Sequence, residues 1–68
     1  MPRKVRHLKA DLKKAGFVEQ TKQGKGSHVR WEHPTGVFVT MSGHDGDDAH
    51  PYQEREVRQA IKDAAERA

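Results

Sequence analysis

Apolar residues recur with a helical period near both ends of the chain, and this pattern constrains the fold more than any other feature. The first stripe has intervals of three and four residues: Val5, Leu8, Leu12 and Ala15. This spacing predicts a helix over about residues 3–15, with Pro2 suited to its start and Gly16 to its end. The second stripe follows Pro51: Val57, Ala60, Ile61, Ala64 and Ala68. Each helix has a single apolar face, so we expect both to cover the same buried layer.

Between the two stripes the apolar residues alternate with polar ones, as in half-buried strands. Residues 27–33 and 37–41 show this alternation, and the sequence His-Pro-Thr-Gly at 33–36 fits a type I turn between them. A further short strand is expected over residues 17–22, followed by a glycine turn over 23–26. The hairpin should turn four side chains toward the core: Val29, Trp31, Val37 and Val39.

These elements predict an α+β fold of order αβββα, with two helices on one face of a three-stranded antiparallel sheet. Of the 22 hydrophobic residues, seven are Ala and one is Met1, which leaves 14 larger apolar side chains. That number fits one domain over residues 1–68 with a thin core and without a deep pocket. The sequence has no Cys, no apolar run of membrane-spanning length and no hydrophobic signal core at its N-terminus. We therefore expect a cytoplasmic protein.

The net charge of +3 hides an asymmetry between the two halves of the chain. Residues 1–31 contain nine Lys and Arg and two acidic residues, a balance of +7, whereas residues 32–68 carry a balance of −4. A basic half suggests a polyanionic partner. Charges that simply keep a small protein soluble are the equally simple alternative.

Residues 24–31, Gly-Lys-Gly-Ser-His-Val-Arg-Trp, are the best candidate segment for a catalytic site. His28 begins a strand on the expected open face of the sheet, Arg30 is two residues further on the same side, and Lys25 lies in the glycine turn. An imidazole can remove a proton from a ribose 2′-hydroxyl or donate one to a leaving oxygen. Neighbouring cations can hold the phosphate. The alternative is an exposed strand His beside an ordinary hairpin turn.

The chain resembles the HicA family, the toxin half of bacterial HicA–HicB toxin–antitoxin modules. The resemblance spans nearly the whole chain and rests on these stretches: Lys14-Ala15-Gly16-Phe17, Gly26-Ser27-His28 followed by Trp31, His33-Pro34-Thr35-Gly36, Val39-Thr40 and Val57-Arg58-Gln59-Ala60-Ile61. It implies a fold like the double-stranded-RNA-binding domain and metal-independent, ribosome-independent cleavage of mRNA, without a cofactor. It also implies a HicB-like antitoxin as partner, and it matches His28 to the essential His of the family.

The predicted function is therefore a toxin endoribonuclease with RNA as substrate. His28 is the expected general acid/base, Lys25 and Arg30 the expected phosphate ligands, and Gly26 and Ser27 the residues that position the strand start. A non-catalytic RNA-binding module of the same fold and a protein-interaction module are the alternatives. Replacing His28 separates them, since a nuclease would lose cleavage whereas a binding module would barely change.

Residues 44–50 depart from the family pattern, because they are acidic where many relatives carry basic residues. A Gly that commonly opens the last helix in relatives is also missing here. An acidic loop near an RNA site should weaken phosphate attraction. Its His and Asp side chains suit several metal ions, but the spacing fails the EF-hand pattern, so a solvated loop is the favoured interpretation.

Three ring side chains have more than one interpretation. Trp31 could stack on a base, but its alternation with Val29 favours core packing. His33 is favoured as a turn-stabilising residue over a ligand. Phe38 falls on the open face, where stacking on RNA, contact with an antitoxin and partial burial are all open.

Overall fold

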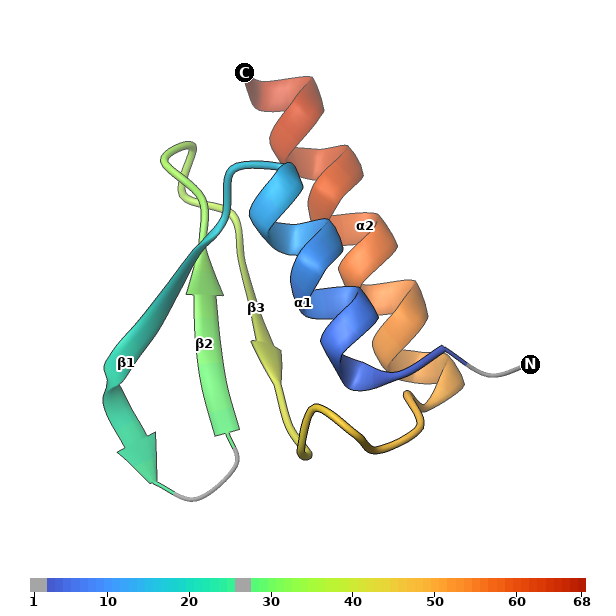
Figure 1. The fold of residues 1–68 in the computed structure, drawn as a ribbon. Coiled ribbons are helices and arrows are strands. Elements are labelled where there is room, and N and C mark those ends of the chain that lie inside the picture. Colours follow the sequence, from blue (N-terminus) through green and yellow to red (C-terminus); the bar gives the residue numbers. More distant parts are fainter. Residues whose placement is uncertain (1–2, 26–27) are drawn as a thin grey trace.

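The two helices lie side by side over one face of an antiparallel sheet, and no helix of the described residues covers the opposite face (Figure 1). This computed structural model describes residues 3–25 and 28–68. The elements follow one another as α1 (Val5–Lys14), β1 (Val18–Lys25), β2 (His28–Glu32), β3 (Phe38–Met41) and α2 (Pro51–Arg67). The strand order in the sheet is β1-β2-β3. The predicted αβββα order and the placement of both helices on one face are confirmed.

The core lies between the helices and the sheet, because the two helical stripes and the inner face of the hairpin meet there. Its buried members are Val5, Leu8, Leu12, Phe17, Trp31, Val39, Met41, Ala49, Val57, Ala60 and Ala64. Val29, Val37 and Ile61 are partly buried against it. The predicted core face of the hairpin is therefore confirmed. Ala68 was expected in the second stripe, but it is exposed, because the helix ends at Arg67 beyond the last turn that packs on the core.

The hairpin between β2 and β3 closes through the predicted turn. The backbone N–H of Gly36 donates to the carbonyl of His33 at 2.9 Å, and the N–H of His33 donates to the carbonyl of Val37 at 2.8 Å. Gly36 has φ +99°, a conformation that costs glycine little. The resulting register places Trp31 opposite Val39 and Val29 opposite Met41, with all four side chains toward the helices.

Strand β1 is longer than the sequence suggested. A turn was expected over residues 23–26, but β1 runs to Lys25, which is paired with His28 of β2. The ladder is irregular between Gln20, which is opposite Arg30, and Lys25, so β1 advances five residues while β2 advances two. The turn prediction is wrong for residues 23–25, because the strand continues to Lys25 through a stretch of irregular pairing that takes up the extra residues. Gly26 and Ser27 lie outside the described residues.

One polar side chain, Gln53, is buried in the core layer, and the periodicity did not single it out. Its Oε1 accepts the N–H of His50 at 2.8 Å, and its Nε2 donates to the carbonyl of Ser42 at 3.0 Å. Gln53 thus satisfies the start of α2 and ties the preceding loop to it. The signal that could have identified it is a Gln three residues after the helix-capping position.

Candidate functional site

The uncovered face of the sheet presents polar and aromatic side chains in rows across the three strands. Residues directly opposite one another in antiparallel strands point to the same face. The pairing therefore puts Gln20, Arg30 and Thr40 in one row. This row lies in an open hollow of about 480 Å³ on the surface of the sheet. Its lining residues are Gln20, His28, Arg30, Glu32 and Thr40.

His28 is the first residue of β2 and its side chain is exposed at one end of this hollow. The His28 side chain forms no hydrogen bond with residues 3–20 or 29–68. The backbone of Lys25 is paired with His28, so these two candidate residues are brought together. Gly26 and Ser27, which were also predicted to belong to the site, lie outside the described residues.

Arg30 is held on the open face by two neighbours. Its Nε lies 2.6 Å from Oε2 of Glu32, and its guanidinium carbon lies 4.0 Å from the centroid of the Phe38 ring. The ion pair is half exposed and contributes little to stability, but together with the cation–π contact it limits where the guanidinium can go. Glu32 was not among the predicted site residues. It balances the charge of Arg30, so any anion that approached Arg30 would compete with this carboxylate.

The exposure of each ring side chain bears on the interpretations that the sequence left open. Trp31 is 1% exposed, which confirms its place in the core, whereas Phe38 is 53% exposed on the open face. Nδ1 of His33 lies 2.9 Å from Oγ1 of Thr35. The same nitrogen accepts a hydrogen bond from the backbone N–H of Thr35 at 3.1 Å. The His33 ring also packs against Phe17, with centroids 5.1 Å apart. His33 is thus a turn-stabilising residue, as predicted.

The acidic loop is exposed, but it is bound to the start of α1 rather than merely solvated. Asp45 accepts a hydrogen bond from Nζ of Lys9 at 2.7 Å, and Asp48 is ion-paired with Lys4. The carbonyl of Asp47 accepts the N–H of Val5 at 2.9 Å, which satisfies a donor at the helix start. The hydrogen bond from Lys9 lowers the pKa of Asp45 below its ordinary value. Two of the loop's three carboxylates are therefore balanced by Lys4, just before α1, and by Lys9 within it.

No metal site is assembled by this loop. Among residues 3–25 and 28–68, the structure contains no group of three or more His, Asp or Glu side chains placed to hold a metal ion.

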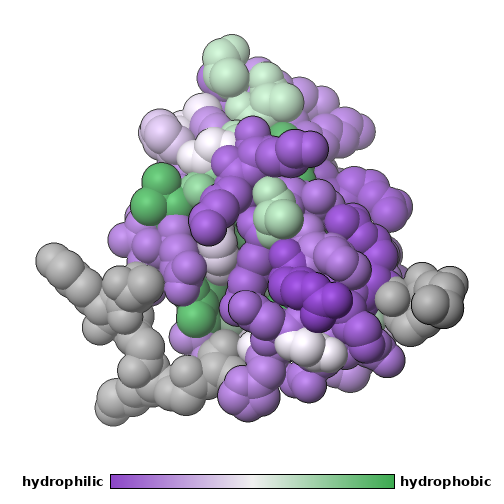
Figure 2. Space-filling model, viewed as in Figure 1, coloured by the Kyte–Doolittle hydropathy of each residue, from purple (hydrophilic) through white to green (hydrophobic). Residues whose placement is uncertain are grey.

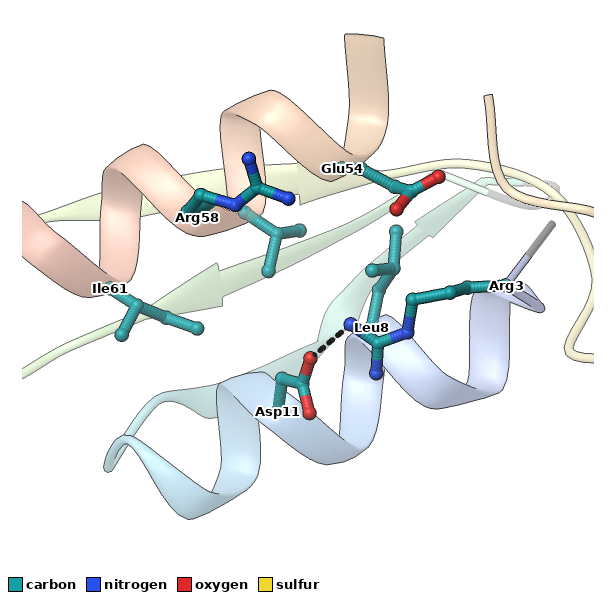
Figure 3. Close-up of a pocket in the computed structure, with 7 residues that line it drawn as sticks. Arg3, Leu8, Asp11, Glu54, Arg58 and Ile61 are labelled. Atoms are coloured by element: carbon teal, nitrogen blue, oxygen red, sulfur yellow. Dashed lines mark hydrogen bonds and ion pairs between the residues drawn. The ribbon is translucent and has the colours of Figure 1, made fainter. Parts of the chain in front are cut away.

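A second hollow, of about 130 Å³, lies between α1 and α2 (Figure 3). Arg3 reaches across to Asp11 of α1 with a hydrogen bond of 2.7 Å, while Glu54 and Arg58 extend from α2. The bond to Asp11 raises the pKa of the Arg3 guanidinium. Leu8 and Ile61 form its apolar wall. The hollow is small and its polar groups tie chain segments together, so it belongs to the helix packing.

The surface in the orientation of Figure 1 is hydrophilic over most of its area, and its apolar spots are small and separate (Figure 2). Within the part of the chain that the structure describes, neither helix is long and apolar enough to cross a membrane.

Comparison with known proteins gives one match. The family model described as HicA toxin of bacterial toxin-antitoxin matches residues 5–65, from the first residue of α1 nearly to the end of α2. No curated protein and no solved structure matched the chain significantly. The match covers all three strands and the hollow on the open face.

Proposed function

The chain belongs to the HicA toxin family of bacterial toxin–antitoxin systems, and from this premise we propose that it is an endoribonuclease that cleaves mRNA independently of the ribosome. Toxins of this family are generally RNases that cleave mRNA and are paired with a cognate antitoxin. The observation that carries the finer proposal is that His28 and Arg30 are exposed in one hollow on the uncovered face of the sheet. With mRNA as substrate, the proposed place of action is the cytoplasm.

The proposed reaction is transfer of the phosphodiester to the adjacent 2′-oxygen. His28 takes the proton of the ribose 2′-hydroxyl, the 2′-oxygen bonds to phosphorus, and the bond from phosphorus to the 5′-oxygen breaks. The leaving 5′-oxygen takes its proton from water. The products are a 2′,3′-cyclic phosphate and a 5′-hydroxyl. No step in this sequence calls for a metal ion.

Charge stabilisation in this reaction is assigned to Arg30 and Lys25. Arg30 lies along β2 from His28 by a two-residue step of about 6.6 Å, and its side chain lines the same hollow. It must exchange the Glu32 carboxylate for a phosphate oxygen, a change between two charge-assisted contacts of similar kind. Lys25, Gly26 and Ser27 are proposed to contact RNA at the end of the hollow where His28 begins β2.

Incubation of purified protein with a model RNA, without ribosomes and with a chelator present, tests the proposed function. We expect cleavage, and we expect chemical analysis of the new 3′ ends to show cyclic phosphate. Intact RNA under these conditions would contradict ribosome- and metal-independent cleavage. Linear 3′-hydroxyl ends would contradict attack by the 2′-oxygen.

Replacing Arg30 with Ala is expected to lower kcat/KM for RNA cleavage about 10- to 100-fold, the value of one hydrogen bond to a charged group. The exposed ion pair with Glu32 contributes little to stability, so the melting temperature should stay within a few degrees of wild type. The matched control is Arg55→Ala, which removes an exposed Arg from α2 on the other side of the sheet. Equal losses for the two variants would show a general charge effect and contradict a specific phosphate contact.

A HicB-like antitoxin is the proposed protein partner. The open hollow has no covering element within the described residues, so an active enzyme needs an inhibitor from outside. The balance of +7 over residues 1–31 favours an acidic partner with fast, salt-sensitive association. Co-expression with the antitoxin should relieve growth arrest and give a complex in which His28 is protected from chemical modification. Growth arrest that is equal with and without the antitoxin would contradict this proposal.

A further inference from the structure

Phe38 is a large apolar side chain on the open face of the sheet, where the alternation of the strand predicted it. It is 53% exposed at the start of β3, on the face of the sheet that no helix covers. It forms a row across the sheet with Glu32 and Val18, and Val18 is also exposed, by 57%. The exposed ring gains little from the core, so packing does not account for a Phe at this position.

The rows of side chains on the open face differ in chemistry along the length of the strands. His28 stands at one end, Arg30 lies in the middle row with Gln20 and Thr40, and Phe38 lies in the last row. Each row is about 6.6 Å from the next along the strands. One extended chain could therefore touch an acid/base group, then a cation, then an apolar ring.

The contact between Arg30 and Phe38 prepares a flat surface for stacking. The guanidinium lies 4.0 Å above the ring centroid, and Nε of the same side chain is fixed by Glu32 at 2.6 Å. Aromatic rings and Arg planes are the two protein surfaces on which unpaired bases stack. A paired base offers only its edges in the grooves, whereas an unpaired base offers a face.

We propose that Phe38 is the base-stacking residue of this site, so that an unpaired nucleobase of single-stranded RNA packs on the Phe38–Arg30 pair while the neighbouring phosphate lies toward His28. This inference rests on the proposed function and adds a substrate class, single-stranded RNA, and a residue that selects it. Arg30 joins the two contacts, since its charge can serve the phosphate while its guanidinium is stacked on one face of the Phe38 ring. Because both helices pack on the other face of the sheet, all of these rows are accessible to a single strand of RNA.

The test is equilibrium binding of a short single-stranded 2′-O-methyl RNA, measured by fluorescence anisotropy. This probe has no 2′-hydroxyl, so it stays intact whether or not the protein is a nuclease. Phe38→Leu is expected to weaken binding about 5- to 150-fold, the value of one stacked base. Phe38→Tyr should restore it, because the ring is kept. The matched control is Tyr52→Leu, an aromatic residue 47% exposed on α2, which should bind like wild type.

A second arm identifies the stacked base. An abasic site is moved along the RNA, and at one position it should weaken binding to the wild type by a similar factor. The same abasic RNA should bind Phe38→Leu no more weakly than the intact RNA does, because the stack is already lost. Duplex RNA of the same sequence should bind more weakly than the single strand, with little dependence on residue 38.

Several results would overturn the inference. They are wild-type affinity in Phe38→Leu, no binding of the single strand by wild type, or equal loss in Tyr52→Leu. Loss of antitoxin binding in Phe38→Leu with RNA binding unchanged would assign the ring to the protein partner instead. If the wild type binds the probe through Phe38 but cleaves no RNA, only the proposed nuclease fails. If it cleaves RNA while Phe38→Leu binds normally, only the stacking proposal fails.

Discussion

Replacing His28 with Ala is expected to slow cleavage of a model RNA by about 10²- to 10⁴-fold, the usual contribution of a general acid/base. The fold should be unaffected, because the side chain is exposed at the first residue of β2. It also makes no hydrogen bond with residues 3–20 or 29–68, and surface substitutions of this kind change the free energy of unfolding by about 0.5 kcal/mol or less. The measurements are cleavage rates under single-turnover conditions and a thermal melt of each variant.

The matched control for this variant is His44→Ala, since His44 is an exposed His in the loop outside the hollow. It should cleave RNA at the wild-type rate. Binding of RNA by His28→Ala should persist, which separates lost catalysis from lost affinity. Undiminished cleavage by a folded His28→Ala protein would remove the catalytic assignment. A collapsed melting temperature would instead identify a structural histidine.

Truncating Trp31 to Ala is expected to lower the free energy of unfolding by about 3–5 kcal/mol. The side chain is 1% exposed and is the largest of the fully buried side chains in the core. Domains have about 0.05–0.15 kcal/mol of stability per residue, which is about 3–10 kcal/mol for a chain of this size. The variant should therefore lose at least about a third of this stability, and its urea midpoint should fall accordingly. Urea titration followed by circular dichroism measures this, because the chain has a single Trp and the variant loses its fluorescence.

Trp31→Phe provides the control for ring volume. It keeps an aromatic ring in the core and removes the indole Nε1, which is buried without a hydrogen-bond partner among the described residues. Removing an unpartnered donor offsets part of the lost packing, so this variant should be clearly more stable than Trp31→Ala. A Trp31→Ala protein with wild-type stability but weakened RNA binding would contradict the core assignment and restore a stacking role for Trp31.

Local patterns in the sequence determined the element order and the turn. The helical stripe Val5–Leu8–Leu12 and the alternation of Val29 and Trp31 depend only on residues within one or two turns or pleats of each other. Period alone therefore predicts which side of each element is apolar. The same logic put His28, Arg30 and Phe38 on the open face. The family match to the HicA toxins agrees with the resemblance carried by the same segments.

The grouping of residues across elements was decided only by the tertiary structure. Arg30 meets Phe38 because the β2–β3 register sets Glu32 opposite Phe38 and Arg30 opposite Thr40, and no local pattern encodes a register. The irregular pairing in β1 carried the strand to Lys25, beyond the predicted end at residue 22.

The acidic loop shows the same limit over a longer distance along the chain. By sequence alone, residues 44–50 form a charged segment expected to repel phosphate. In the folded chain, Asp45 is bound to Lys9, which is 36 residues away, and Asp48 is bound to Lys4. A charge pattern fixes which groups are present, whereas their partners depend on how the chain brings distant segments together. The sequence thus determined the faces of this protein, and the tertiary structure decided which side chains share them, because register and long-range ion pairs are properties of the packed chain.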